Sequence, residues 1–123
     1  LNDKVSDHMI QKAIHIACAE DFIDTLPLGL DTVLGERGNG LSEGQIQRIA
    51  IARAILSNAD ILMFDEATSA LDEETELRVL ENISGLKDKT CIIVTHRKAA
   101  INYCNRHYYL ENGRLEEREY VSN

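Results

Sequence analysis

The chain has 123 residues, of which 44% are hydrophobic and 28% are charged, and its formal net charge is -8. This length allows one domain or a part of a larger one, and the composition is that of a folded chain, not a disordered one. The acidic balance argues against non-specific binding to nucleic acid, because a phosphate backbone would be repelled.

Membrane and export signals are absent from the sequence. No apolar run reaches the ~20 residues of a membrane helix, and Leu1-Asn2-Asp3-Lys4 does not resemble a signal peptide. We therefore expect no direct membrane insertion of this segment. The cysteines Cys18, Cys91 and Cys104 include no CxxC pair, so reduced, cytosolic thiols are the simplest interpretation. The chain starts without methionine, which fits a segment of a longer protein.

The first half of the chain is predicted to be helical. Ser6 can cap a helix that runs to about Ala19, since apolar residues recur there at three- and four-residue spacing. A second, short helix over residues 21–26 is stopped by Pro27, the only proline.

A glycine-rich connector follows over residues 28–40. Its stretch from Gly35 to Gly40 has the G-x-x-x-x-G spacing of a phosphate-binding P-loop, and Ser42 follows. A P-loop also needs a lysine that neutralises the β- and γ-phosphates, but Leu41 stands in its place. Glu36 would moreover put a carboxylate inside the anion cradle. We therefore reject a P-loop and interpret these residues as a connector into the next helix.

That next helix is predicted over residues 43–56. Ser42 and Gln45 have the S-x-x-Q spacing of a capping box, which many helices use without binding a ligand. The same residues could alternatively bind a phosphate. Because Gly44 lacks a side chain, a phosphate can approach the free amides and the Ser42 hydroxyl at the positive end of the helix.

The second half alternates strands with helices, which predicts a parallel sheet. The short apolar run from Ile61 to Phe64 suits a strand buried on both faces. The β-branched run from Thr90 to Thr95 predicts a second strand. The other expected elements are a helix from Asp72 or Glu73 to about Ile83, a helix near residues 98–103, and a hairpin of residues 107–110 and 114–117 around Asn112-Gly113.

Polar side chains follow both predicted strands. Asp65 and Glu66 end the first strand and His96 ends the second, and the carboxyl ends of parallel strands are where α/β sheets bind ligands. One acid can hold Mg²⁺, the other can take a proton from water, and the histidine can hydrogen-bond a γ-phosphate or position a water. Each residue alone also suits a cap, a solvated turn or a structural role, but their convergence on one sheet edge favours a phosphate-handling site.

Together these segments resemble the nucleotide-binding domain of ATP-binding cassette (ABC) proteins. Leu41 to Gln45 matches the family signature, usually LSGGQ, and residues 47–54 match the helix behind it. The further matches are Ile61 to Glu66 (the Walker B strand), Ser69 to Asp72 (the D-loop), His96 (the switch histidine) and Asn112-Gly113-Arg114-Leu115 (the late hairpin).

The resemblance implies an α/β, P-loop NTPase-like ABC ATPase fold, of which this chain is a C-terminal part without the Walker A loop. Residues 1–59 would form the α-helical subdomain with the signature helix, and residues 60–123 the C-terminal part of the ATPase core. Residues 21–27 and 31–38 are similar to exporter-type cassettes. Glu36 then becomes a candidate coupling residue facing the transmembrane domain, although a solvated loop acid is the alternative.

The resemblance also implies roles for the site residues. Asp65 would bind Mg²⁺, while Glu66 and His96 would be catalytic, Glu66 by polarising the attacking water and His96 by contacting the γ-phosphate. Ser42, Gly44 and Gln45 would contact ATP bound to a second nucleotide-binding domain in a head-to-tail dimer, and Ser69 and Asp72 would lie across that interface.

The implied function is ATP binding and hydrolysis coupled to substrate export, at the cytoplasmic face of a membrane. Without the phosphate loop, we expect the isolated segment to be inactive. Glu43 replaces the usual signature glycine and adds a negative charge beside the incoming phosphate. The alternatives are a non-transport ABC ATPase of the DNA-repair or translation type, and a catalytically silent interaction module.

Overall fold

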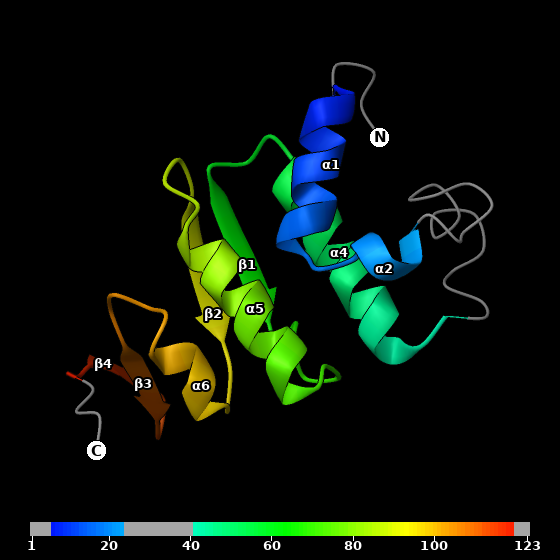
Figure 1. Cartoon of the computed structure of the whole chain (residues 1–123). Helices are drawn as coiled ribbons and strands as arrows, with labels where there is room; N and C mark the ends of the chain where they lie inside the picture. Colours follow the sequence, from blue (N-terminus) through cyan, green and yellow to red (C-terminus); the bar gives the residue numbers. More distant parts are fainter. Residues whose placement is uncertain (1–5, 24–40, 120–123) are drawn as a thin grey trace.

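A computed structural model describes residues 6–23 and 41–119 of the chain. Figure 1 shows the elements in chain order: α1 (Asp7–Ile16), α2 (Glu20–Ile23), α4 (Glu43–Leu56), β1 (Ile61–Asp65), α5 (Glu73–Ser84), β2 (Thr90–Val94), α6 (Lys98–Ile101), β3 (Tyr108–Glu111) and β4 (Arg114–Glu117). Within these ranges no helix combines the length and the apolar character that crossing a membrane requires. The predicted connector over residues 28–40 lies outside the described residues, as do Pro27 and the predicted end of the second helix.

The helix boundaries follow local capping. At the start of α1 the Ser6 hydroxyl accepts from the Met9 amide at 3.2 Å, as predicted. The helix ends at Ile16, earlier than the predicted Ala19, because Cys18 adopts the left-handed conformation with φ 56°. For α4, the predicted range of residues 43–56 is confirmed.

Two pairs of strands form two small sheets. β1 pairs with β2 in parallel, with Ile61 opposite Thr90 and Asp65 opposite Val94, which confirms the parallel sheet. β3 and β4 pair antiparallel. Between them Asn112 and Gly113 have φ values of 51° and 77°, the positive values that a two-residue type I′ turn requires, so the predicted hairpin is confirmed.

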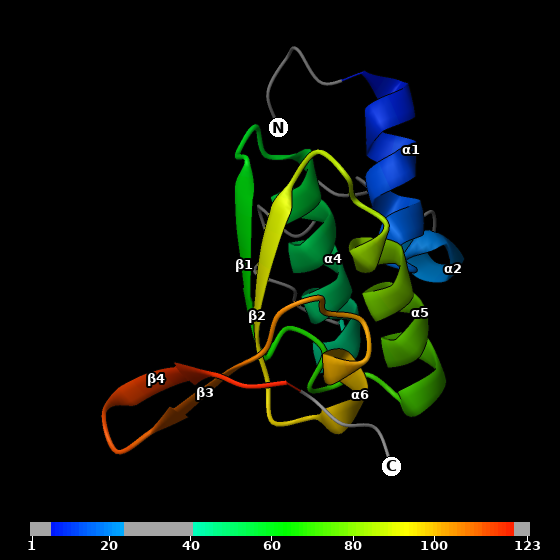
Figure 2. The ribbon, with the colours of Figure 1, turned by 90° about the vertical axis from the view of Figure 1, so that its left-hand side faces the viewer.

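The prediction that the first strand is buried on both faces is wrong. Leu62 and Phe64 are only 4% and 5% exposed, whereas Ile61 and Met63 are 61% and 66% exposed. Figure 2 shows the reason: α4 and α5 both lie on one side of the β1–β2 sheet. Within the described residues nothing covers the opposite face, which carries Ile61, Met63, Ile92 and Val94.

One hydrophobic core joins the helices to the covered face of the sheet. Most of its buried members come from α1, α2, α4, β1 and α5, among them Ile14, Phe22, Ile49, Phe64 and Val79. The core therefore runs across the predicted boundary between residues 59 and 60. Dividing the chain there into a helical subdomain and a part of the ATPase core stays a proposal based on family resemblance.

Candidate functional site

The ends of β1 and β2 bring an acid and the histidine into contact. The Glu66 amide donates to the Val94 carbonyl at 2.8 Å and so continues the ladder one residue past β1. The Glu66 side chain then approaches the next loop, where its Oε1 lies 3.2 Å from His96 Nε2. Asp65 is exposed at the last position of β1, directly before Glu66 in the sequence. The predicted convergence of Glu66 and His96 is therefore present in the structure.

Glu66 has a strained backbone. Its φ is 51°, in the left-handed region that costs a non-glycine residue about 1–3 kcal/mol and that recurs at functional sites. Neighbouring groups hold it there, since its carbonyl accepts from the Ser69 amide at 3.2 Å and from Gln47 Nε2 at 3.4 Å. This strain had no signal in the sequence.

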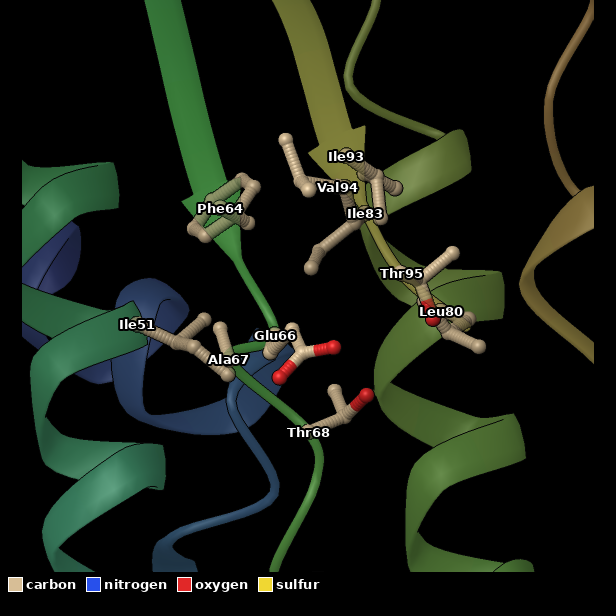
Figure 3. A pocket seen from close by; sticks show the side chains of 10 residues that line it. All are labelled: Ile51, Phe64, Glu66, Ala67, Thr68, Leu80, Ile83, Ile93, Val94 and Thr95. Atoms are coloured by element: carbon tan, nitrogen blue, oxygen red, sulfur yellow. The ribbon is translucent and has the colours of Figure 1, made fainter. Parts of the chain in front are cut away.

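A small hollow opens beside Glu66. Figure 3 shows the side chains that line it: Glu66, Thr68 and Thr95, together with apolar side chains from α4, α5 and both strands. Its volume is about 10 Å³, whereas small-molecule sites span roughly 300–1,000 Å³. The hollow is therefore too small to enclose a ligand.

The N-terminus of α4 has the predicted capping box. The Ser42 hydroxyl accepts from the Gln45 amide at 3.1 Å, and the Ser42 amide donates to Gln45 Oε1 at 3.0 Å. In this arrangement the hydroxyl keeps its own hydrogen and the Gln45 side chain keeps its NH₂ group as donors. Capping and binding an anion are thus compatible at this helix end. Glu43 lies exposed in the first turn.

Gly44 packs against the D-loop. A Cβ at this position would lie 3.1 Å from the Ala70 carbonyl oxygen and 3.4 Å from Leu71 Cδ2. The absent side chain therefore permits a close approach between α4 and the D-loop. This reason differs from the phosphate approach predicted from the sequence, which stays a prediction.

Gly44→Ala is expected to displace the D-loop. The added methyl group meets a backbone oxygen that gives way only if the loop moves, so the usual gain of about 1 kcal/mol for alanine over glycine in a helix should be lost. The amide resonances of Ala70 and Leu71 should shift in a nitrogen–proton correlation spectrum. Gly85→Ala is the control, since its Cβ would meet only the Asn82 and Glu81 carbonyl oxygens, at 3.4 and 3.9 Å. Equal spectra for Gly44→Ala and the parent chain would contradict the expectation.

The predicted D-loop residues have local partners. Asp72 is the N-cap of α5, and its Oδ1 accepts from the Thr75 amide at 2.7 Å. This hydrogen bond lowers the pKa of Asp72 below its ordinary value. The Ser69 hydroxyl accepts from Gln47 Nε2 at 2.8 Å. Glu36, the predicted coupling residue, lies outside the described residues.

Two residues of α4 contribute to this region without having been predicted to do so. Besides its bonds to Ser69 and Glu66, Gln47 accepts from the Ala70 amide at 2.9 Å. Arg48, whose side chain is 15% exposed, donates to the Gly44 carbonyl at 3.3 Å and to the Cys18 carbonyl at 2.9 Å. In the sequence, the one indication of this role was that both residues lie in the helix that follows the signature and matches the family.

Comparison with known proteins identifies the family. The sequence model described as "ABC transporter" matches residues 3–69, which is more than half of the chain. The chain therefore belongs to the ABC transporter family, and its fold is part of an ABC ATPase domain.

Similar proteins with known names include an export protein and a flippase. The chain is 50% identical over 109 residues to the beta-(1→2)glucan export ATP-binding/permease protein of Rhizobium meliloti, covering 88% of this chain and 19% of that protein. It is 50% identical over 115 residues to the ATP-dependent lipid A-core flippase of Thiobacillus denitrificans, covering 93% of this chain and 20% of the flippase.

A solved structure has the same fold. It is a bacterial Atm1-family ABC exporter with ATP bound, 42% identical, with a TM-score of 0.77 over 93% of this chain and 20% of the exporter chain. The chain thus spans about one fifth of the length of the relatives that it matches.

Proposed function

We propose that this chain supplies two edges of ATP sites in an ABC exporter. The observation that carries the proposal is the contact of 3.2 Å between Glu66 and His96 at the carboxyl ends of two parallel strands. The names of two similar proteins, an export protein and an ABC exporter, support export over a DNA-repair or translation function. In this proposal residues 1–59 act as the helical subdomain and residues 60–123 as part of the ATPase core.

The first edge acts on ATP held by a phosphate loop of the same cassette. Glu66 polarises the attacking water and accepts its proton, while the neighbouring His96 donates to the γ-phosphate. In phosphoryl transfer most of the catalysis comes from such positioning and from charge neutralisation. The strained backbone of Glu66 is consistent with a carboxylate held in one place.

Asp65 is the candidate magnesium ligand. Mg²⁺ is commonly bound by one or two carboxylates together with substrate phosphates and water, and an exposed carboxylate at the end of β1 fits such a donor set. When bound, the ion would neutralise phosphate charge. The described residues contain no group of three or more histidine, cysteine or acidic side chains that could hold a metal by themselves. Phosphate oxygens and water would supply the other ligands of the ion.

The second edge completes the site of a partner cassette. Ser42 and Gln45 offer hydroxyl and amide donors at the N-terminus of α4, where backbone amides also favour an anion, and Gly44 keeps this helix end close to the D-loop. Ser69 and Asp72 lie at the same interface of a head-to-tail dimer. Hydrolysis then depends on closure of the dimer, and Glu36 passes that motion to the transmembrane domain at the cytoplasmic face of the membrane.

Reconstitution tests the proposal. Titrated with ATP and Mg²⁺ in a calorimeter, the 123-residue chain alone should show little binding. Joined to the segment of a related exporter that carries the phosphate loop, it should hydrolyse ATP when Mg²⁺ is present. The control is the same joined protein with the phosphate-loop lysine replaced by alanine. Micromolar binding by the chain alone, or an inactive joined protein that is folded, would overturn the proposal.

A further inference from the structure

Glu76 on α5 is the buried charged residue of the described part of the chain, only 2% exposed. A buried carboxylate is costly unless its oxygens are paired. Both oxygens of Glu76 have partners: Oε1 lies 3.0 Å from Arg97 Nη1, and Oε2 accepts from the Thr68 hydroxyl at 2.8 Å. One partner follows β1 and the other follows β2, so Glu76 ties together the two loops that carry the candidate catalytic residues.

Arg97 makes a second connection between these loops. It directly follows His96, and its Nη2 donates to the Ser69 carbonyl at 2.7 Å while Nη1 holds Glu76. A guanidinium can bridge two acceptors in this manner because its donors form a rigid planar fork, whereas a lysine carries a single ammonium on a flexible chain.

Gln47 holds the same loop from the signature helix. Its Nε2 donates to the Ser69 hydroxyl and its Oε1 accepts from the Ala70 amide. Residues 66–70 are therefore fixed from α4 on one side and from α5 and the loop after β2 on the other. The loop begins with Glu66, which is held in a strained conformation and contacts His96.

We propose that Glu76 and Arg97 are positioning residues that hold the Glu66 carboxylate and the D-loop in register with His96. Neither touches the reacting atoms. The expected effect on catalysis rests on the proposed function. The connection between the two loops follows from the contacts of Glu76 and Arg97 alone.

Hydrogen exchange on the 123-residue chain tests the tie itself. Arg97→Lys keeps the charge but not the fork, so the Ala70 and Leu71 amides should exchange about tenfold faster, while the amides of α1 keep their rates. Arg78→Lys is the matched control, because Arg78 pairs with Glu74 on the exposed surface of α5. Unchanged exchange in Arg97→Lys, or equal acceleration throughout the chain, would overturn the inference.

Steady-state kinetics of the joined protein described above test the positioning role. Glu76→Gln and Arg97→Lys should each lower kcat about tenfold or more, since misplacing a catalytic group by an ångström costs up to about a hundredfold, while KM for ATP stays within about twofold. A double variant no slower than the singles is expected for residues that act together. An inactive parent protein would reject the proposed function. The hydrogen-exchange experiment would still show whether Arg97 connects the two loops. An active parent whose variants match it in kcat rejects the positioning role.

Discussion

Glu66→Gln is expected to lower ATP turnover by about 10²–10⁴-fold in the joined protein, the range that a well-placed general base contributes. The amide keeps the size of the side chain and its contact with His96 but no longer accepts the proton of the attacking water. Binding of ATP should be preserved, because the phosphates are held by other groups. Release of phosphate under steady-state conditions measures the first effect, and calorimetric titration measures the second.

Glu73→Gln provides the comparison for this experiment. Glu73 is an exposed acid in the first turn of α5, so its replacement removes one negative charge near the site without changing the contacts of Glu66. Turnover should stay within about twofold of the parent protein, the scale of a surface change. Equal turnover in Glu66→Gln and Glu73→Gln would rule out Glu66 as the base.

Ile49→Ala is expected to reduce the free energy of unfolding by about 2–5 kcal/mol, as for other large-to-small changes in a core. Ile49 is fully buried on α4 and belongs to the core that joins α1, α4 and β1. Removing its side chain leaves a cavity between the signature helix and the sheet. Urea unfolding of the 123-residue chain, followed by circular dichroism, measures the loss.

The same helix offers a control of identical chemistry. Ile46 lies one turn earlier on α4 and is 37% exposed, so Ile46→Ala opens no closed cavity. Its cost should be about 1 kcal/mol or less, since only part of the side chain leaves water on folding. Similar losses for the two variants would show that the core does not form as described.

Local signals in the sequence predicted most of the elements. Ser42 with Gln45 located the start of α4, and Asn112-Gly113 located the hairpin turn, because capping and turn geometry depend on adjacent residues. The burial of β1 was predicted wrongly. An apolar run does not reveal how many faces of a strand are covered, since that depends on elements elsewhere in the chain.

The candidate site was predicted as far as topology determines it. Glu66 and His96 meet because the carboxyl ends of parallel strands meet, and this follows from the order of strand, helix and strand. The contacts of Arg97 with Ser69 and of Gln47 with Ala70 join residues more than twenty positions apart. Sequence spacing does not predict contacts between side chains so far apart in the chain. The positioning residues could therefore be identified only from the structure.

Substitutions on the two faces of β1 should affect the stability of this chain differently. Substitutions at Leu62 and Phe64 disturb packing against the chain's own helices, so a stability screen of the 123 residues will register them. Ile61 and Met63 lie on the exposed face, and the same screen will score polar replacements there as tolerated. In the joined protein these two positions should become sensitive if the added segment covers them. Comparing the two screens would therefore map, residue by residue, which contacts the added segment makes with the sheet.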